Sequence, residues 1–156
     1  MTGHATGERL GTGLTDPAVL YTQVQQFYAH QIALLDDLRA EEFAATFTVA
    51  GIFTPSPATP PLHGRAAIAA ALRAAHERKF GTEPVRRRHW FTMLRVDSGP
   101  AGTLRTRCST LVAVTRPWDP NPVIGPSAVV EDVLVHGDDG TLFTLERRVT
   151  PDHLSF

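Results

Sequence analysis

One histidine of this chain lies where a strand would bury it, and it is the first candidate for chemistry. The segment RRRHWFTML, residues 86 to 94, brings three arginines up to His89 and continues with apolar side chains. An imidazole can accept and return a proton near neutral pH. Strand alternation places His89 on one face with Phe91 and Met93. That face is either one wall of a site or part of the core, with His89 bonded to a backbone partner.

Two carboxylates could work with this histidine. Asp36 lies in LLDD near the end of a helical pattern, where a solvated pair with Asp37 is the alternative interpretation. Asp132 lies in VVEDVLV, an apolar strand pattern in which a carboxylate must be paired or lie at an edge. Glu131 precedes it, so one of the two points inward and the other outward.

Other catalytic schemes have little support in the sequence. The single cysteine, Cys108, excludes an internal disulfide and a cysteine zinc site, and its position in a strand pattern indicates a core residue. No GxSxG, Walker or HExxH motif occurs, and the histidines show no metal-ligand spacing. The glycine-containing GTGLTD at residues 11 to 16 follows no strand, which argues against a phosphate loop.

Composition narrows the class of protein. The 156 residues, 42% hydrophobic and 20% charged, predict a packed globular chain, and a net charge of -1 provides no field for nucleic acid or an anionic membrane. The Arg86–Arg88 run is the only basic cluster, and we favour a solvated strand end over an anion contact there. No apolar signal segment or membrane span is present, so we expect a cytoplasmic protein.

The first half of the chain has helical periodicity. Residues 1–15, rich in Gly and Thr, predict a disordered tail, and 16–156 predict a single domain. Asp16 and Pro17 are a helix start, and apolar residues at steps of three and four predict a long helix over 17–38. Further helices are expected over 40–47 and 64–80, with a short strand in GIFTPS and an irregular proline-rich connection between them.

The second half has strand periodicity. Residues 87–97, 104–116, 127–136 and 141–150 are rich in Val, Thr, Leu and Phe. The segments DSGPAGT and PWDPNPVIGP and the turn at 137–140 separate them, and such short connections predict antiparallel neighbours. The fold class is therefore α+β, with helices packed on one face of an antiparallel sheet.

Four segments together resemble a known family. QIALLDDLRAEEFAATFTVAGIF, HGRAAIAAALRA, RRRHWFTMLRVD and VVEDVLVHGDDGTLFTLERRVTPD are similar to the SnoaL-like branch of the nuclear-transport-factor-two-like superfamily, over roughly residues 18 to 152. The resemblance is strongest to small cyclases and dehydratases of bacterial aromatic polyketide pathways. It implies a cone-shaped curved antiparallel sheet around the long first helix, an apolar cavity, and a homodimer formed through the outer sheet face.

The resemblance also implies a site. Family members need no metal or organic cofactor, and they pair an aspartate late in the first helix with a histidine on the strand after the third helix, which correspond to Asp36 and His89. The expected ligand is an aromatic polyketide, bound by cavity residues that the resemblance and the strand pattern suggest: Tyr28, Gln31, Phe53, Phe91, Met93, Trp118 and Asp132. Trp118 is either a lid over the cavity or an anchor for its loop.

Two departures from the family pattern stand beside these expectations. Several relatives carry a tyrosine five residues before the helix aspartate, where this chain has Gln31, and the aspartate of the word FTxDG is Ala50. The superfamily also includes accessory and binding proteins without activity. The sequence therefore predicts a cofactor-independent cyclase or dehydratase, with a non-catalytic ligand-binding or accessory subunit as the alternative.

Overall fold

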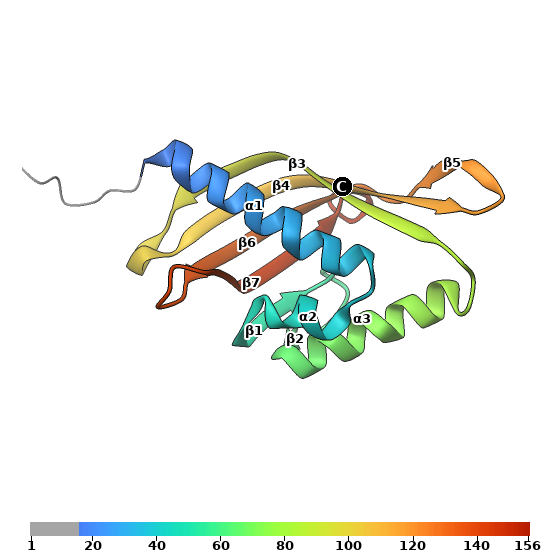
Figure 1. Ribbon diagram of the computed structural model, residues 1–156, viewed down its shortest axis with the longest axis horizontal. Helices are drawn as coiled ribbons and strands as arrows, with labels where there is room; N and C mark the ends of the chain where they lie inside the picture. Colours follow the sequence, from blue (N-terminus) through green and yellow to red (C-terminus); the bar gives the residue numbers. More distant parts are fainter. Residues whose placement is uncertain (1–15) are drawn as a thin grey trace, which may run out of the picture.

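Three helices precede most of the sheet in the computed structural model, which describes residues 16–156 (Figure 1). They are α1 (Pro17–Asp36), α2 (Ala40–Ala45) and α3 (Arg65–Phe80), and two short 3-10 helices, η1 (Pro100–Gly102) and η2 (Asp152–Leu154), follow later. The predicted start of α1 is confirmed, because Asp16 Oδ1 accepts a hydrogen bond from Ala18 N at 2.8 Å. The tail expected over residues 1–15 lies outside the described residues.

The strands form one open, curved sheet in the order β2-β1-β7-β6-β4-β3, with β5 paired to β4. Their bounds are β1 Phe47–Thr54, β2 Leu62–His63, β3 Arg86–Ser98, β4 Leu104–Arg116, β5 Asp119–Ile124, β6 Ala128–His136 and β7 Leu142–Pro151. The predicted α+β class and curved sheet are confirmed.

Two details of the sheet differ from the sequence expectation. β1 and β7 are parallel, so the sheet is mixed; no short hairpin joins these two strands, and their direction is therefore free. The segment PWDPNPVIGP, expected to be a loop, contains the strand β5, which forms an antiparallel hairpin with the end of β4. Its prolines are tolerated because β5 is an edge strand with few ladder bonds.

Helix α1 lies across one face of the sheet, and α2 and α3 pack near β1 and β2 (Figure 1). One core cluster joins α1 to the sheet through Val24, Tyr28, Leu104, Cys108, Leu134 and Leu142. A second cluster joins α2, α3 and β1, with Phe43, Phe47 and Ile68 fully buried. Only the first of these clusters borders the site described below.

A bulge interrupts β3 and changes which side chains face α1. The register with β4 shifts between Thr92 and Arg95, and Met93 adopts a left-handed φ of 53°. Met93 is 79% exposed, whereas Leu94 packs against the core. The expectation that Met93 shares the inner face with His89 is therefore wrong, because regular alternation ends at the bulge.

Candidate active site

The end of α1 fixes the position of Asp36. The chain leaves the helix through a Schellman motif, in which Arg39 N donates to Leu34 O at 2.9 Å and Leu38 N to Leu35 O at 3.1 Å. Leu38 has the left-handed φ of 56° that this motif requires. Asp36, the last helical residue, is thereby held in the final turn, facing β3.

His89 meets Asp36 through both its ring and its backbone. His89 Nδ1 lies 2.6 Å from Asp36 Oδ1, and His89 N donates to the two carboxylate oxygens at 3.1 and 3.2 Å. The side chains are 18% and 6% exposed, respectively. A carboxylate that accepts from Nδ1–H selects the tautomer in which Nε2 carries the lone pair. The structure thus brings together the two residues proposed as an acid/base pair and leaves Nε2 available.

The pair lies in an open groove of about 530 Å³ between α1 and the edge strand β3. Polar and apolar side chains contribute about equally to its walls. The lining residues are Gln25, Tyr28, Ala29, Ile32, Ala33 and Asp36 of α1, and Arg88, His89, Trp90, Phe91 and Thr92 of β3. Such a groove has the size and the mixed apolar and polar lining of a small-molecule site.

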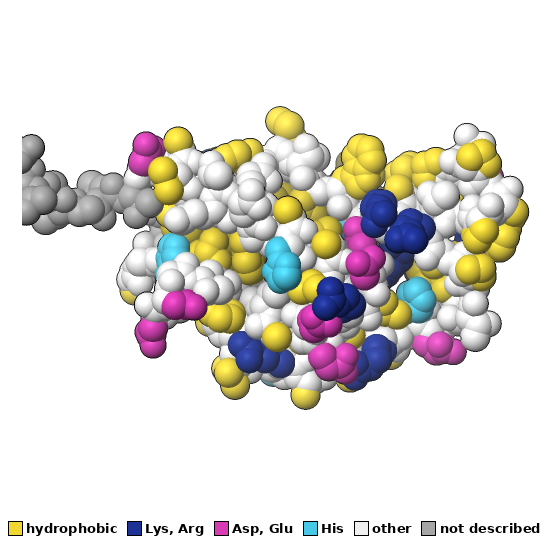
Figure 2. Space-filling model, in the orientation of Figure 1, with side chains coloured by type: hydrophobic (Ala, Val, Ile, Leu, Met, Phe, Trp, Pro, Cys, Tyr) yellow, Lys and Arg dark blue, Asp and Glu magenta, His cyan; other side chains and the backbone are white. Residues whose placement is uncertain are grey.

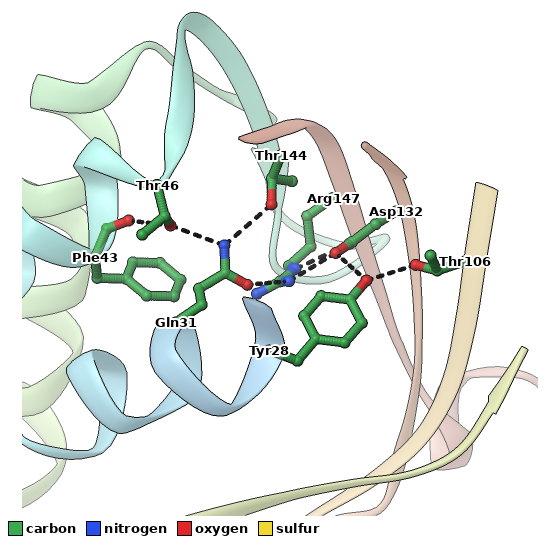
Figure 3. A network of polar contacts seen from close by, with 8 residues as sticks. All are labelled: Tyr28, Gln31, Phe43, Thr46, Thr106, Asp132, Thr144 and Arg147. Atoms are coloured by element: carbon green, nitrogen blue, oxygen red, sulfur yellow. Dashed lines mark hydrogen bonds and ion pairs between the residues drawn. The ribbon is translucent and has the colours of Figure 1, made fainter. Parts of the chain in front are cut away.

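A buried polar network lies directly behind the groove (Figure 3). The Arg147 guanidinium is 2% exposed and binds Asp132 through two hydrogen bonds, of 2.9 Å from Nε and 2.6 Å from Nη2. The same Nη2 donates to Gln31 Oε1 at 2.6 Å. Gln31 Nε2 in turn donates to Thr144 Oγ1 at 3.0 Å and to Thr46 Oγ1 at 2.8 Å. Nε and Nη2 of Arg147 and both carboxylate oxygens of Asp132 are hydrogen-bonded, as a buried ion pair requires.

Tyr28 connects this network to the groove. Its hydroxyl donates to Asp132 Oδ2 at 2.7 Å and lies 2.5 Å from Thr106 Oγ1. Burial, followed by the charge of Asp132, raises the pKa of Tyr28 well above its ordinary value. The hydroxyl therefore remains protonated, and the ring rather than the hydroxyl forms the groove wall.

Aromatic rings surround the buried cation. The Arg147 guanidinium carbon lies 5.7 Å from the ring centroids of Tyr28 and Phe47 and 5.4 Å from that of Phe91. Tyr28 and Phe91 meet edge to face at 5.5 Å. Because both rings line the groove, the ion pair packs directly behind the groove wall.

The predicted binding residues fall into two groups. Tyr28 and Phe91 line the groove, as expected, together with His89 and Asp36. Gln31 and Asp132 do not; both are buried, at 0% and 3% exposure, as members of the network behind it.

Two other predicted residues lie away from the groove. Phe53 is on β1 and packs against Phe47 in the second core cluster, at 6.1 Å between ring centroids. Trp118 is 66% exposed in the turn between β4 and β5, so in this structure it is neither a lid over the groove nor a buried anchor. These placements correct the expected cavity lining, because neither β1 nor the turn after β4 contributes a residue to the groove.

Several residues of the site escaped sequence reasoning. Arg147 is the partner that the buried Asp132 required, and Thr106 and Thr144 complete the network. A carboxylate in an apolar strand was the available indication of Arg147, since it demands a cation nearby. Arg87, interpreted as part of a solvated strand end, is half-buried and its Nη2 donates to Leu35 O at 3.2 Å.

Cys108 is buried, as predicted, and burial raises the pKa of its thiol to about 12.

Within residues 16–156, no group of three or more His, Cys, Asp or Glu side chains is arranged to hold a metal ion. None of the helices in the described part of the chain has the length and hydropathy of a membrane span.

Comparison with known proteins identifies the family. The model of the SnoaL-like domain matches residues 18–148. The chain belongs to the SnoaL-like family. The comparison with curated proteins gives no match.

Solved structures of SnoaL-like relatives agree with the fold described above. ActVI-ORFA from Streptomyces coelicolor is 39% identical, with 86% of this chain and 98% of that chain covered and a TM-score of 0.82. A Catenulispora acidiphila protein, solved in complex with S-DNPA, is 43% identical over 88% and 97% of the two chains, with a TM-score of 0.80. Aln2 from a Streptomyces species is 34% identical over 92% and 97%, with a TM-score of 0.81. Membership of the SnoaL-like family supports a role of the polyketide cyclase or dehydratase type.

Proposed function

We propose that this SnoaL-like protein is a cofactor-independent cyclase or dehydratase acting on an aromatic polyketide intermediate, with His89 and Asp36 as its acid/base pair. The observation that carries the proposal is the 2.6 Å contact between His89 Nδ1 and Asp36 Oδ1 in a groove of about 530 Å³. A relative that is 43% identical binds S-DNPA, which supports a small-molecule ligand for this groove.

The geometry suggests how the pair would work. With Nδ1–H bonded to Asp36, His89 Nε2 takes a proton from the carbon next to a substrate carbonyl, and the electron pair of the broken C–H bond moves into the enolate. The imidazolium so formed is stabilised by the carboxylate beside it. His89 then returns the proton to a leaving hydroxyl, which departs as water in a dehydration, or to the oxygen of an attacked carbonyl in a ring closure.

The groove walls would contribute orientation. Phe91 and Tyr28 offer ring faces and edges to a flat substrate, and Ile32 and Ala33 complete an apolar wall on α1. Restricting a flexible polyketide to one conformer can remove much of the entropic barrier to ring closure. This part of the proposal predicts a substrate with at least one planar ring.

A panel of bicyclic and tricyclic polyketide intermediates, with S-DNPA as a binding probe, tests the proposal. Turnover is followed by mass spectrometry and binding by calorimetry, for the native protein, His89→Ala and Asp36→Asn. We expect both changes to lower turnover roughly 10²- to 10⁴-fold while binding persists. His30→Ala, which changes an exposed histidine of α1, is the matched control and should be fully active. Ligand binding without turnover in the native protein would instead support the ligand-binding alternative.

We propose in addition that the protein is a homodimer through the outer face of the sheet. That face carries exposed Ile124, at 55%, and the ion pair of Arg107 with Glu131. Because both charge signs occur there, a second copy can meet it with complementary charges. Light scattering should give twice the chain mass of 17.0 kDa, and Ile124→Glu should reduce it to one chain. A native protein of 17.0 kDa would contradict the homodimer.

A further inference from the structure

The C-terminal end of α1 carries more negative charge than the helix itself can balance. Asp36 is its last residue and Asp37 follows directly, yet its last turn contains no basic residue. The free carbonyl groups at a helix C-terminus already carry a partial negative charge, so two carboxylates are unfavourable there. A positive group from another element is needed at this end.

Arg87 of β3 supplies that positive group. Its Nη2 donates to Leu35 O, one of the last carbonyl groups of α1, at 3.2 Å. Arg87 lies two residues before His89 on the same inner face of β3, whereas its neighbours Arg86 and Arg88 are exposed. Figure 2 shows Lys and Arg side chains beside Asp and Glu side chains where β3 passes the end of α1.

The charge of Arg87 is coupled to Asp36. Burial lowers the pKa of Arg87, and the charge of Asp36 opposes that shift by raising it. The guanidinium and the Asp36 carboxylate therefore attract each other. Two side chains of one strand, Arg87 and His89, therefore bind consecutive residues at the end of α1, Leu35 and Asp36.

We propose that Arg87 is a positioning residue of the proposed acid/base pair: it ties β3 to the last turn of α1 through Leu35 O, and its positive charge attracts the Asp36 carboxylate that holds His89. The inference depends on the proposed function for its catalytic meaning, but the ionic relationship can be measured without turnover. Arg87 is absent from the groove lining, so its effect on a ligand is exerted through Asp36 and His89.

The sign of the effect follows from the charges around the pair. The ionisable groups near it are Arg88 and Tyr28, which line the groove, Asp37 next to Asp36, and Arg87. On the neighbouring strand β4, the residue paired with His89 is Val112, which does not titrate. Removing the positive charge of Arg87 makes a proton on either His89 or Asp36 more favourable. The titration midpoint of His89 should therefore rise.

The experiment is an NMR titration of the His89 ring in the native protein, Arg87→Gln and Arg87→Lys. Gln retains an N–H donor for Leu35 O without the charge, and Lys retains the charge without the planar guanidinium. We expect the midpoint of His89 to rise by roughly 0.5 to 1 pH unit in Arg87→Gln and to stay near the native value in Arg87→Lys. Arg86→Met, on the outer face of the same strand, is the matched control and should leave it unchanged.

Kinetics provide the second readout once a substrate is known. The acid limb of the kcat profile should move to higher pH in Arg87→Gln by the same amount, with KM unchanged, since Arg87 does not line the groove.

An unchanged His89 midpoint in a folded Arg87→Gln protein overturns the inference. If the midpoint moves as expected while no polyketide is turned over, the proposed function fails and the ionic role of Arg87 stands. If Arg87→Gln does not fold, a shifted midpoint in Arg87→Lys contradicts the inference.

Discussion

Asp36 accepts hydrogen bonds from both the ring and the backbone of His89, the ring nitrogen at 2.6 Å and the backbone nitrogen at 3.1 and 3.2 Å. Since β3 is the edge strand, this carboxylate bonds a backbone N–H that has no neighbouring strand to accept it. The contact therefore fixes the imidazole in two ways, through its own nitrogen and through the main chain to which it is attached.

The tautomer of His89 follows from this arrangement. In the native protein at neutral or higher pH, Nδ1 should carry the proton and Nε2 should be free, which long-range ¹⁵N–¹H NMR distinguishes by chemical shift. In Asp36→Asn the amide nitrogen can donate to Nδ1, and the Nε2–H tautomer should then appear. Asp37→Asn, one residue along, is the control and should leave the native tautomer. An Nε2–H tautomer in the native protein would contradict the role assigned to Asp36.

The buried ion pair should control stability. Arg147→Met leaves Asp132 as an uncompensated buried charge and should lower the free energy of unfolding by about 3–5 kcal/mol in urea denaturation. Arg148→Met, at the next position but in an exposed pair with Glu146 at 3.4 Å, should cost less than about 1 kcal/mol. The double change Asp132→Leu with Arg147→Met should be much less harmful than the two single losses added together. Additive losses would show that the pair acts as two independent residues.

The sequence could not predict that Arg147 is the partner of Asp132. The helices and the long strands followed from periodicity, and the need of Asp132 for a partner followed from its apolar surroundings. Leu142 pairs with His136, so a regular hairpin would bring Glu146 opposite Asp132. An irregularity in the β6–β7 register, between Val133 and Leu134, brings Arg147 there instead. One extra residue in β7, which the hydrophobic pattern of the sequence does not reveal, thus determines which charged side chain is buried opposite Asp132.

The sequence predicted the acid/base residues of the groove better than it predicted the residues that line the groove. His89 and Phe91 share a face by alternation, and the structure keeps them together. Met93 lies on the other face because of the bulge in β3, and Trp118 lies outside the groove in the turn of the β4–β5 hairpin. Both departures depend on strand register, which only tertiary pairing determines. Arg87 shares the face of His89 by the same alternation, but only the tertiary structure shows that its guanidinium reaches Leu35 O of α1.

Ligand binding should depend on Phe91 and not on Met93. Phe91→Leu removes an aromatic wall of the groove and should weaken binding of the probe ligand about tenfold, with the shape of the core largely retained. Met93→Ala changes a side chain that is 79% exposed beyond the bulge and should leave the affinity unchanged. Calorimetry on both variants decides. A loss of affinity in Met93→Ala would mean that β3 changes its register when the ligand binds.

Trp118 provides a separate prediction about the β4–β5 hairpin. Its ring is 66% exposed and lies outside the groove, so Trp118→Ala should leave both ligand affinity and stability close to native. Calorimetry and urea denaturation measure the two quantities. Weaker binding with unchanged stability would show that the hairpin closes over the ligand, which is the lid alternative.

Stability at alkaline pH should reveal the environment of Cys108. Its thiol has a pKa of about 12 in the folded protein against an ordinary value of 9.0, because burial and then the charge of Asp132 disfavour the thiolate. Between these values the unfolded chain releases a proton that the folded protein keeps, so stability is complete below about pH 9 and falls as the pH rises toward 12. This one group should account for about 1 kcal/mol of loss between pH 8 and pH 10.

Cys108→Ala isolates that share from the other groups that titrate in the same range. Tyr28 also has a raised pKa and adds its own alkaline loss, but that contribution is present in both proteins and cancels in the comparison. We therefore expect the free energy of unfolding to fall less steeply from pH 8 to pH 10 in Cys108→Ala than in the native protein, whatever the absolute effect of the smaller side chain. Urea denaturation at several pH values measures the two slopes. Equal slopes would mean that the native thiol ionises as readily as in the unfolded chain, and that the core around Cys108 admits water.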